Sequence, residues 1–156
     1  MPFGIMRDRF DEVLLRGTRE LSVTLGVLAY IEADCYELVA VQSNSGAYVP
    51  GEQYSLGNSF CKEIMVREDM VSEIKIGNSP LSLHHPLYRS LPLECFIGAP
   101  VYLHGTLWGS LDFSSMAQRD TPFSEQDVQL VLDQAEEMSE LISSSDFLTK
   151  EASMCK

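Results

Sequence analysis

The stretch GAPVYLHGTLWGSLDFSS, residues 98–115, decides the fold. Small and apolar residues alternate on both sides of His104 and Gly105, and glycine tolerates the positive φ that a tight turn needs. The stretch therefore predicts a β-hairpin with its turn at this dipeptide. Its second arm also carries Asp112, an acidic residue in the middle of an otherwise buried pattern, which needs a physical explanation.

The position of the turn predicts which side chains share a face, because directly opposed residues lie on the same side of a sheet. One face is predicted to hold an apolar floor, one large aromatic ring and two polar groups: Ile97, Ala99, Val101, Trp108, Ser110 and Asp112. The other is predicted to pack against helices: Phe96, Gly98, Pro100, Tyr102, Leu107, Gly109, Leu111 and Phe113. The first face either lines a small-molecule pocket or is partly solvated, and the alternation favours neither.

The rest of the chain supplies further elements in an order without regular βαβ alternation. This order predicts an antiparallel sheet in an α+β layer architecture. The predicted elements are an amphipathic helix over 5–21, a hairpin over 24–44, a loop over 44–58, a short helix over 59–68, an edge strand over 70–76 and a capped amphipathic helix over 123–142.

Length and net charge limit the number of domains and the classes of partner that the sequence allows. The 156 residues predict a single domain over 1–145, followed by a polar tail or the start of a linker over 146–156. A net charge of −12 argues against nucleic acid and anionic membranes as partners. The sequence contains neither a signal-peptide pattern nor an apolar run long enough to span a bilayer, so we expect a cytoplasmic protein without membrane insertion.

The four cysteines are spaced too widely for a CxxC motif: Cys35, Cys61, Cys95 and Cys155. We therefore expect free, mostly buried thiols and no structural metal site. Cys61 is interpreted as core filling, with a ligand-facing thiol as the alternative.

Further side chains are candidates for ligand contact. His84, with its neighbour His85, belongs to a loop predicted to border the pocket, where one of the two either binds haem or an anion or is plain polar surface. Trp108 either stacks on a planar ligand or is a large wall residue. A buried Asp112 requires a hydrogen-bond donor, which can be a ligand amine, a backbone N–H or an arginine such as Arg89.

Three segments together resemble the GAF domain family in its bacterial sensor variety. ECFIGAPVYLHGTLWGSLDFSS (94–115) is similar to the family's aromatic-Ile-Gly-x-Pro strand, turn and aromatic-Gly-x-Leu-x-Phe strand. RDTPFSEQDVQLVLDQAEEMSELI (119–142) is similar to its closing helix, and SLGNSFCKEIM (55–65) carries the Gly-x-x-aromatic-Cys start of a short helix. The resemblance covers roughly residues 8–143.

The resemblance implies a GAF-like (profilin- or PAS-like) fold: a five- to six-stranded antiparallel sheet, terminal helices on one face, and loops with short helices forming a ligand pocket on the other. It implies a non-catalytic, small-molecule-sensing domain of a signal-transduction protein, in a histidine kinase of a two-component system or a cyclic-dinucleotide enzyme. The terminal helices would transmit occupancy and form a homodimer. No catalytic or metal-binding residue is expected and the ligand is unassigned; the expected ligand-binding residues are Cys61, His84, Ile97, Ala99, Val101, Trp108, Ser110 and Asp112.

Differences between this sequence and the motifs of particular GAF subgroups argue against two kinds of ligand. In SLHHPLYRSLPLECF (82–96), Cys95 is followed by Phe96 where bilin-binding members have histidine, which argues against a covalent bilin. The motif of cyclic-nucleotide-binding members is absent. The alternative is a thiol-dependent enzyme resembling free methionine sulfoxide reductase, whose chemistry needs a nucleophilic thiolate and a resolving cysteine. Cys61 and Cys95 do not reproduce that cysteine setting. A third hypothesis is a structural dimerisation module with a collapsed pocket.

Overall fold

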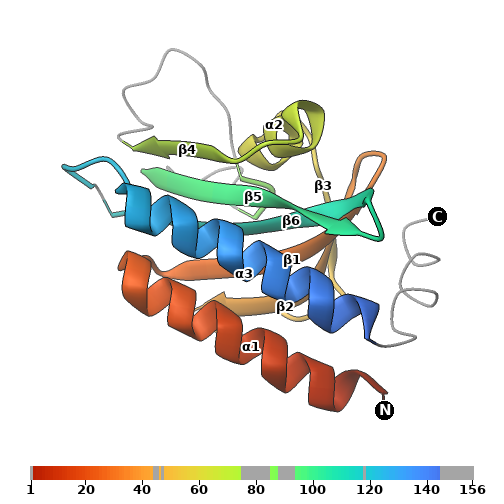
Figure 1. Cartoon of the computed structure of the whole chain (residues 1–156). Helices are drawn as coiled ribbons and strands as arrows, with labels where there is room; N and C mark the ends of the chain where they lie inside the picture. Colours follow the sequence, from red (N-terminus) through yellow and green to blue (C-terminus); the bar gives the residue numbers. More distant parts are fainter. Residues whose placement is uncertain are drawn as a thin grey trace.

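In the computed structural model, residues 2–43, 46, 48–74, 85–87, 94–117 and 119–144 are described, with side chains from residue 7 onward. The helices are α1 (Pro2–Leu21), α2 (Phe60–Arg67) and α3 (Glu125–Ser143). The strands are β1 (Leu25–Glu32), β2 (Cys35–Ser43), β3 (Gln53–Ser55), β4 (Val71–Ile74), β5 (Cys95–Leu103) and β6 (Thr106–Ser115). They form one antiparallel sheet in the order β3-β2-β1-β6-β5-β4 (Figure 1). The predicted α+β architecture with a sheet of up to six strands is confirmed.

The two long helices lie side by side across one face of the sheet (Figure 1). Their apolar stripes, at the 3.6-residue period, meet the sheet in one buried cluster with Leu111 and Phe113 of β6. Ser124 begins α3 with a capping box, in which its side chain and that of Asp127 each accept the other's backbone N–H. In the described part of the chain, no helix is long and apolar enough to cross a membrane.

The opposite face of the sheet is covered by α2 and the segment that leads into it. Ser59 caps this helix by accepting a hydrogen bond from the backbone N–H of Lys62 at 3.2 Å. The buried side of α2 is formed by Phe60, Cys61 and Ile64, which join a second apolar cluster on this face. The sheet therefore separates two cores, one under the long helices and one under α2.

The hairpin turn is where the sequence predicts it. His104 and Gly105 have φ values of 51° and 77°, and Leu103 pairs with Thr106 across the turn. The short edge strand is also confirmed, because β4 lies at one end of the sheet. Strand β3 at the other end was missed, since its three residues lie within a stretch rich in turn-forming residues.

The register beyond the turn corrects the predicted faces. Tyr102 pairs with Leu107 and Val101 with Gly109, so that Trp108 is the extra residue of a β-bulge. A one-residue shift moves every later side chain of one strand to the other face. A Cβ added at Gly109 would lie 2.0 Å from a backbone oxygen of β1, which shows how closely the two strands approach at this point.

The consequence is that the predicted single face is split between the two cores. Four of its members, all apolar, lie in the cluster beneath the long helices: Ile97, Ala99, Val101 and Trp108. The two polar members, Ser110 and Asp112, pair with β1 residues that belong to the cluster under α2. Phe96, predicted to face the terminal helices, also packs under α2. The predicted shared face was therefore wrong, whereas the positions of Leu111 and Phe113 were right.

Candidate functional site

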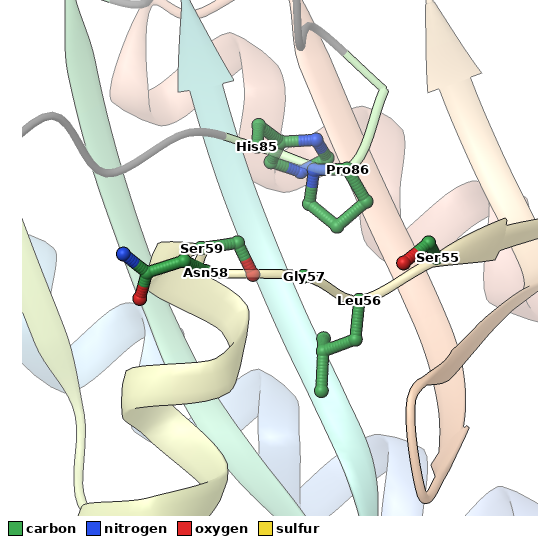
Figure 2. Close-up of a pocket in the computed structure, with 7 residues that line it drawn as sticks. All are labelled: Ser55, Leu56, Gly57, Asn58, Ser59, His85 and Pro86. Carbon is green, nitrogen blue, oxygen red and sulfur yellow. The ribbon is translucent and has the colours of Figure 1, made fainter.

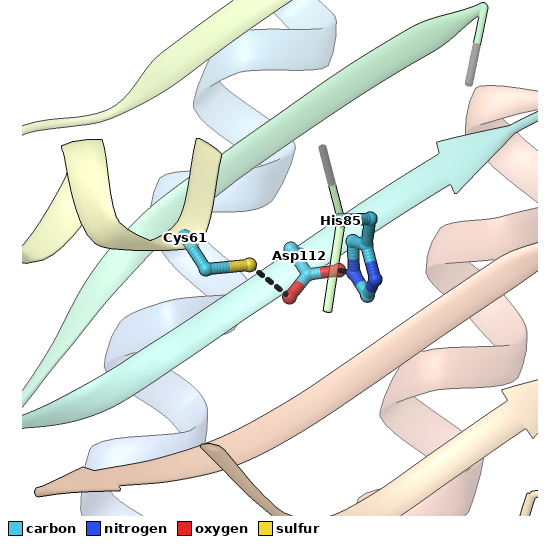
Figure 3. A group of neighbouring side chains, drawn as sticks. All are labelled: Cys61, His85 and Asp112. Atoms are coloured by element: carbon cyan, nitrogen blue, oxygen red, sulfur yellow. Dashed lines mark hydrogen bonds and ion pairs between the residues drawn. The ribbon is translucent and has the colours of Figure 1, made fainter. Parts of the chain in front are cut away.

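Asp112 is the centre of a buried polar cluster on the α2 side of the sheet (Figure 3). Its Oδ1 lies 2.8 Å from Nε2 of His85. Its Oδ2 accepts a hydrogen bond from the Tyr36 hydroxyl at 2.8 Å and one from the Cys61 thiol at 3.4 Å. All four side chains are fully buried. A single carboxyl group thus accepts hydrogen bonds from donors on β2, α2 and the 85–87 segment.

The protonation of His85 follows from its second ring nitrogen. The backbone N–H of Leu87 donates to Nδ1 at 3.1 Å, and an amide nitrogen cannot act as an acceptor in this contact. Nδ1 therefore holds no proton, and the proton of the neutral ring is on Nε2, which donates to Asp112. Tyr36, Cys61 and His85 are thus three neutral donors around one acidic group.

Local structure explains why these side chains meet. Tyr36 projects from β2 to the α2 side, and its ring meets that of His85 edge-on, at 5.8 Å between centroids and 81° between planes. Cys61 is in the first turn of α2, whose position is fixed by Phe60 stacking on Phe96 of β5 at 5.1 Å. The sheet, α2 and the 85–87 segment each contribute a wall to the cluster.

Burial controls the chemistry of the thiol and the phenol. Desolvation, followed by the nearby charge of Asp112, raises the pKa of Cys61 well above 9.0 and the pKa of Tyr36 well above 10.0. Ser110 is close enough to Cys61 to oppose this rise in pKa, although its hydroxyl makes no hydrogen bond of acceptable geometry. The Cys61 thiol is therefore protonated at neutral pH and is a poor nucleophile.

The cluster also presents a possible metal donor set. Within the described residues, Cys61, His85 and Asp112 each offer one ligand atom, and these atoms lie within 4.8 Å of one another. A metal-bound histidine normally donates its other ring N–H to an acceptor. Here the other nitrogen of His85 is itself an acceptor, from Leu87 N–H, so Nε2 has no free lone pair for an ion. The hydrogen-bonding pattern fits a proton-satisfied cluster better than a metal site.

A pocket of about 410 Å³ opens beside this cluster (Figure 2). It is lined by Ser55, Leu56, Gly57, Asn58, Ser59, His85 and Pro86. Figure 2 shows His85 and Pro86 on one side of the pocket, across from the 56–59 segment. Asp34 holds the other side in place, because its carboxylate accepts hydrogen bonds from the Ser55 hydroxyl at 2.7 Å and from Gly57 N–H at 2.9 Å. His85 is thus the side chain common to the pocket and the buried cluster.

The structure brings together only part of the predicted site. Cys61, Ser110 and Asp112 lie near one another on the α2 side. The four apolar candidates (Ile97, Ala99, Val101 and Trp108) lie on the helix side, where Trp108 contacts Tyr30 at 5.5 Å between ring centroids. His84 lies outside the described residues. Ligand contact by any of these side chains stays a prediction.

Sequence reasoning missed two residues of the cluster. Tyr36 follows the alternation of β2, but nothing in the sequence connects it to Asp112, 76 residues later. His85 was weighed together with His84 as a histidine of the loop that borders the pocket, but only His84 was included among the expected ligand-binding residues. The position of His85 before Pro86 was the available signal, since the residue before a proline is held out of helical conformation.

The two free cysteines among the described residues lie far from each other. Cys35 is disulfide-bonded, so the expectation of free thiols was wrong for this residue. Sequence spacing does not report proximity between residues far apart in the chain. Cys61 and Cys95 are free, but Cys61 lies under α2 and Cys95 lies beneath the long helices, on opposite faces of the sheet.

Solved structures with this fold have diverse activities. A type II free methionine-R-sulfoxide reductase from Thermoplasma acidophilum is 17% identical, with a TM-score of 0.72 over 92% of this chain and 96% of that one. The GAF domain of a phosphoenolpyruvate-protein phosphotransferase from Coxiella burnetii is 20% identical, with a TM-score of 0.71 over 94% and 86%. A phycocyanobilin-bound GAF domain from a cyanobacterial phytochrome is 13% identical, with a TM-score of 0.68 over 91% and 86%. At these identities the likeness shows the fold alone.

The sequence comparisons define the family. The comparison with curated proteins found no match. The family model described as GAF domain matches residues 9–142, which include the whole sheet, the larger part of α1 and all of α3 except its last residue. The GAF fold is a regulatory and sensor fold whose structural neighbours here include both signalling domains and methionine-R-sulfoxide reductases. The chain therefore belongs to the GAF domain family.

Proposed function

We propose that this GAF domain is a non-catalytic regulatory domain of a signal-transduction protein and binds a small molecule in the pocket beside His85. The observation that most supports a regulatory role is a continuous series of contacts from the pocket wall to the two long helices. His85 borders the pocket and donates to Asp112 of β6, and the next residue of that strand, Phe113, packs beneath α1 and α3. A ligand that moves His85 therefore acts on the strand that supports both helices.

The packing around Phe113 favours a discrete response. A Cβ added at Gly17 of α1 would lie 2.4 Å from the Phe113 ring, and one added at Gly26 of β1 would lie 2.9 Å from it. Gln134 of α3 is buried nearby, and neither polar atom of its side chain has a hydrogen-bond partner in the described part of the chain. Close-packed interiors transmit strain instead of absorbing it. A ligand that prefers one arrangement of these contacts shifts the population between two helix packings.

A ligand screen followed by hydrogen exchange tests the proposal. A fragment library is screened by thermal shift, and each hit is examined for altered amide exchange in α1 and α3. A ligand at 100 times its Kd stabilises the fold by about 2.7 kcal/mol. Asn58→Trp, on the pocket wall, is expected to abolish the shift, whereas Lys62→Trp, exposed on α2 outside the pocket lining, is expected to preserve it. Binding without any change in the exchange of α1 and α3 would remove the regulatory mechanism.

The proposal includes a cytoplasmic setting, in a histidine kinase or a cyclic-dinucleotide enzyme, and a homodimer formed through α1 and α3. Leu132 on α3 is 39% exposed and is a large apolar side chain that such a contact would cover. Sedimentation of the wild type and Leu132→Lys tests the dimer. A monomer at high concentration, or a dimer unaffected by the substitution, contradicts this interface.

The alternative function is thiol-dependent sulfoxide reduction, and the neighbouring methionine-R-sulfoxide reductases are the observation that favours it. In that chemistry one thiolate takes the sulfoxide oxygen to become a sulfenic acid, and a second thiol then closes a disulfide with release of water. The raised pKa of Cys61 and the separation of Cys61 from Cys95 by the sheet both oppose it. We expect no turnover of free methionine-R-sulfoxide with dithiothreitol; turnover that Cys61→Ser abolishes would establish the enzyme.

A further inference from the structure

The charge of Asp112 is the unusual feature of the buried cluster. Its partners Tyr36, Cys61 and His85 are all neutral donors, as the hydrogen bonds above establish. Among the described residues, no lysine or arginine forms an ion pair with this carboxylate. A buried ionised carboxylate is costly unless it is paired with an opposite charge. The protein thus surrounds Asp112 with neutral dipoles only, at a point where the carboxylate would strongly stabilise a positively charged group.

Helix α2 compensates for only part of this charge. Cys61 is in its first turn, and a helix N-terminus is equivalent to roughly half an elementary positive charge. That partial charge also acts on anything bound in the pocket, since Ser59 at the N-cap is a lining residue. The full charge of Asp112 exceeds it, so the net local field still favours a positive ligand group.

The described residues that line the pocket include no lysine or arginine. These residues are neutral, with His85 held as the neutral tautomer by Leu87 N–H. An anionic ligand would meet no guanidinium or ammonium group from this described lining, and the chain as a whole carries a net charge of −12. This long-range field concentrates cations near the surface and repels anions.

Unused acceptors flank Asp112 on the same side of β6. The hydroxyls of Ser110 and Ser114 are fully buried and make no hydrogen bond with any described residue. Both residues pair with β1 residues of the α2-side cluster, so they share the face of Asp112. An ammonium group has three N–H donors, and a buried carboxylate beside a free hydroxyl offers it complementary acceptors.

We propose that the ligand of this pocket carries a cationic amine, which replaces the His85 imidazole as the donor to Asp112 Oδ1; this inference rests on the proposed function. In this structure His85 occupies the donor position that the ammonium group takes on binding. Because Asp112 is ionised, the bond that it accepts from His85 is already charge-assisted. The exchange adds a positive charge on the donor, and the attraction between opposite charges is strong where water is excluded. A divalent metal ion is disfavoured, because the acceptor role of His85 Nδ1 removes the lone pair that an ion would need.

A charge-matched fragment set tests the ligand class. Each scaffold is supplied as its primary amine, its alcohol and its carboxylate, and binding is measured by thermal shift and by titration calorimetry at pH 7.5. We expect the amines to bind at least tenfold more tightly than their alcohol and carboxylate partners. Asp112→Asn is expected to abolish this preference. Glu63→Gln is the matched control, because it removes one negative charge from α2 outside the cluster and should leave the preference intact.

A second variant covers the case in which Asp112→Asn fails to fold. His85→Ala removes the competing donor, so we expect amine affinity to rise several-fold while alcohol affinity is unchanged. Weaker or unchanged amine binding in His85→Ala would overturn the proposal that the amine takes the place of His85 at Asp112. Infrared difference spectra between the wild type and Asp112→Asn test the premise, and a protonated-carboxyl band from Asp112 would contradict it.

The remaining outcomes separate the two proposals. Alcohols or carboxylates that bind as tightly as the amines, with altered exchange in α1 and α3, would overturn the amine and leave the regulatory function standing. No binding by any member would overturn both. Zinc added alone, binding tightly and losing affinity in Cys61→Ser, would replace the amine with a metal ion.

Discussion

Substituting Tyr36 by phenylalanine tests the buried cluster most directly. The change removes one hydroxyl that donates to Asp112 at 2.8 Å and keeps the ring that packs against His85. A hydrogen bond to a charged group contributes roughly 1.5–3 kcal/mol, and Asp112 retains its two other donors. We therefore expect the free energy of unfolding to fall by about 2 kcal/mol. For a domain of this size, that loss lowers Tm by roughly 4–8 °C.

The assay is guanidinium unfolding followed by far-UV circular dichroism and by fluorescence of Trp108, the single tryptophan. Tyr54→Phe is the matched control, because the Tyr54 hydroxyl donates to Glu52 at the surface, and it should change stability by less than about 0.5 kcal/mol. A cycle with Asp112→Asn should give a coupling energy of at least about 1 kcal/mol. Equal losses for the two tyrosine variants, or additive effects in the cycle, would refute the hydrogen-bond cluster.

Three further expectations concern packing, pH and capping. Gly17→Ala should lower the free energy of unfolding by about 1–2 kcal/mol in chemical denaturation, because overpacking against Phe113 outweighs the helix propensity of alanine; a stabilised variant would contradict this packing. The Cys61 thiol has a raised pKa, so its contribution is complete below about pH 9.0 and is lost as pH rises further, where the unfolded chain releases the proton first. Cys61→Ala should therefore show a shallower alkaline decline in stability, and an identical decline would count against the burial effect. Ser124→Ala should cost about 1 kcal/mol by removing the capping box, measured by thermal unfolding, and a neutral effect would show that α3 does not need its cap.

The sequence predicts the elements well because they depend on local periodicity. The 3.6-residue stripe of α3, the alternation of β5 and β6 and the turn at His104 and Gly105 are all properties of short stretches. The order of these elements lacks regular βαβ alternation, and this observation is sufficient to predict an antiparallel sheet in an α+β layer architecture. The long helices pack on one face of the sheet, as predicted, and a second core with α2 lies on the other face.

The site was only partly predictable, since it depends on register and on contacts between distant residues. One bulged residue, Trp108, places Asp112 on the face opposite Ile97, with which it was predicted to share a face, and no local propensity sets the position of the bulge. Gly109 was the available signal, because a glycine inside a strand pattern often marks a bulge or a close backbone approach. The contacts that Tyr36 and His85 make with Asp112 span 76 and 27 residues, beyond the reach of any spacing rule.

The antiparallel arrangement of α1 and α3 has a practical consequence. Arg16 pairs with Glu137 at 3.2 Å, and in Figure 1 the first turn of α1 and the last turn of α3 lie at the same end of the helix layer. The domain could therefore be inserted into a surface loop of a fluorescent reporter, with both junctions entering that loop from one side. A small slide between the two helices would then be converted directly into a change of brightness, which makes this arrangement suited to a genetically encoded biosensor.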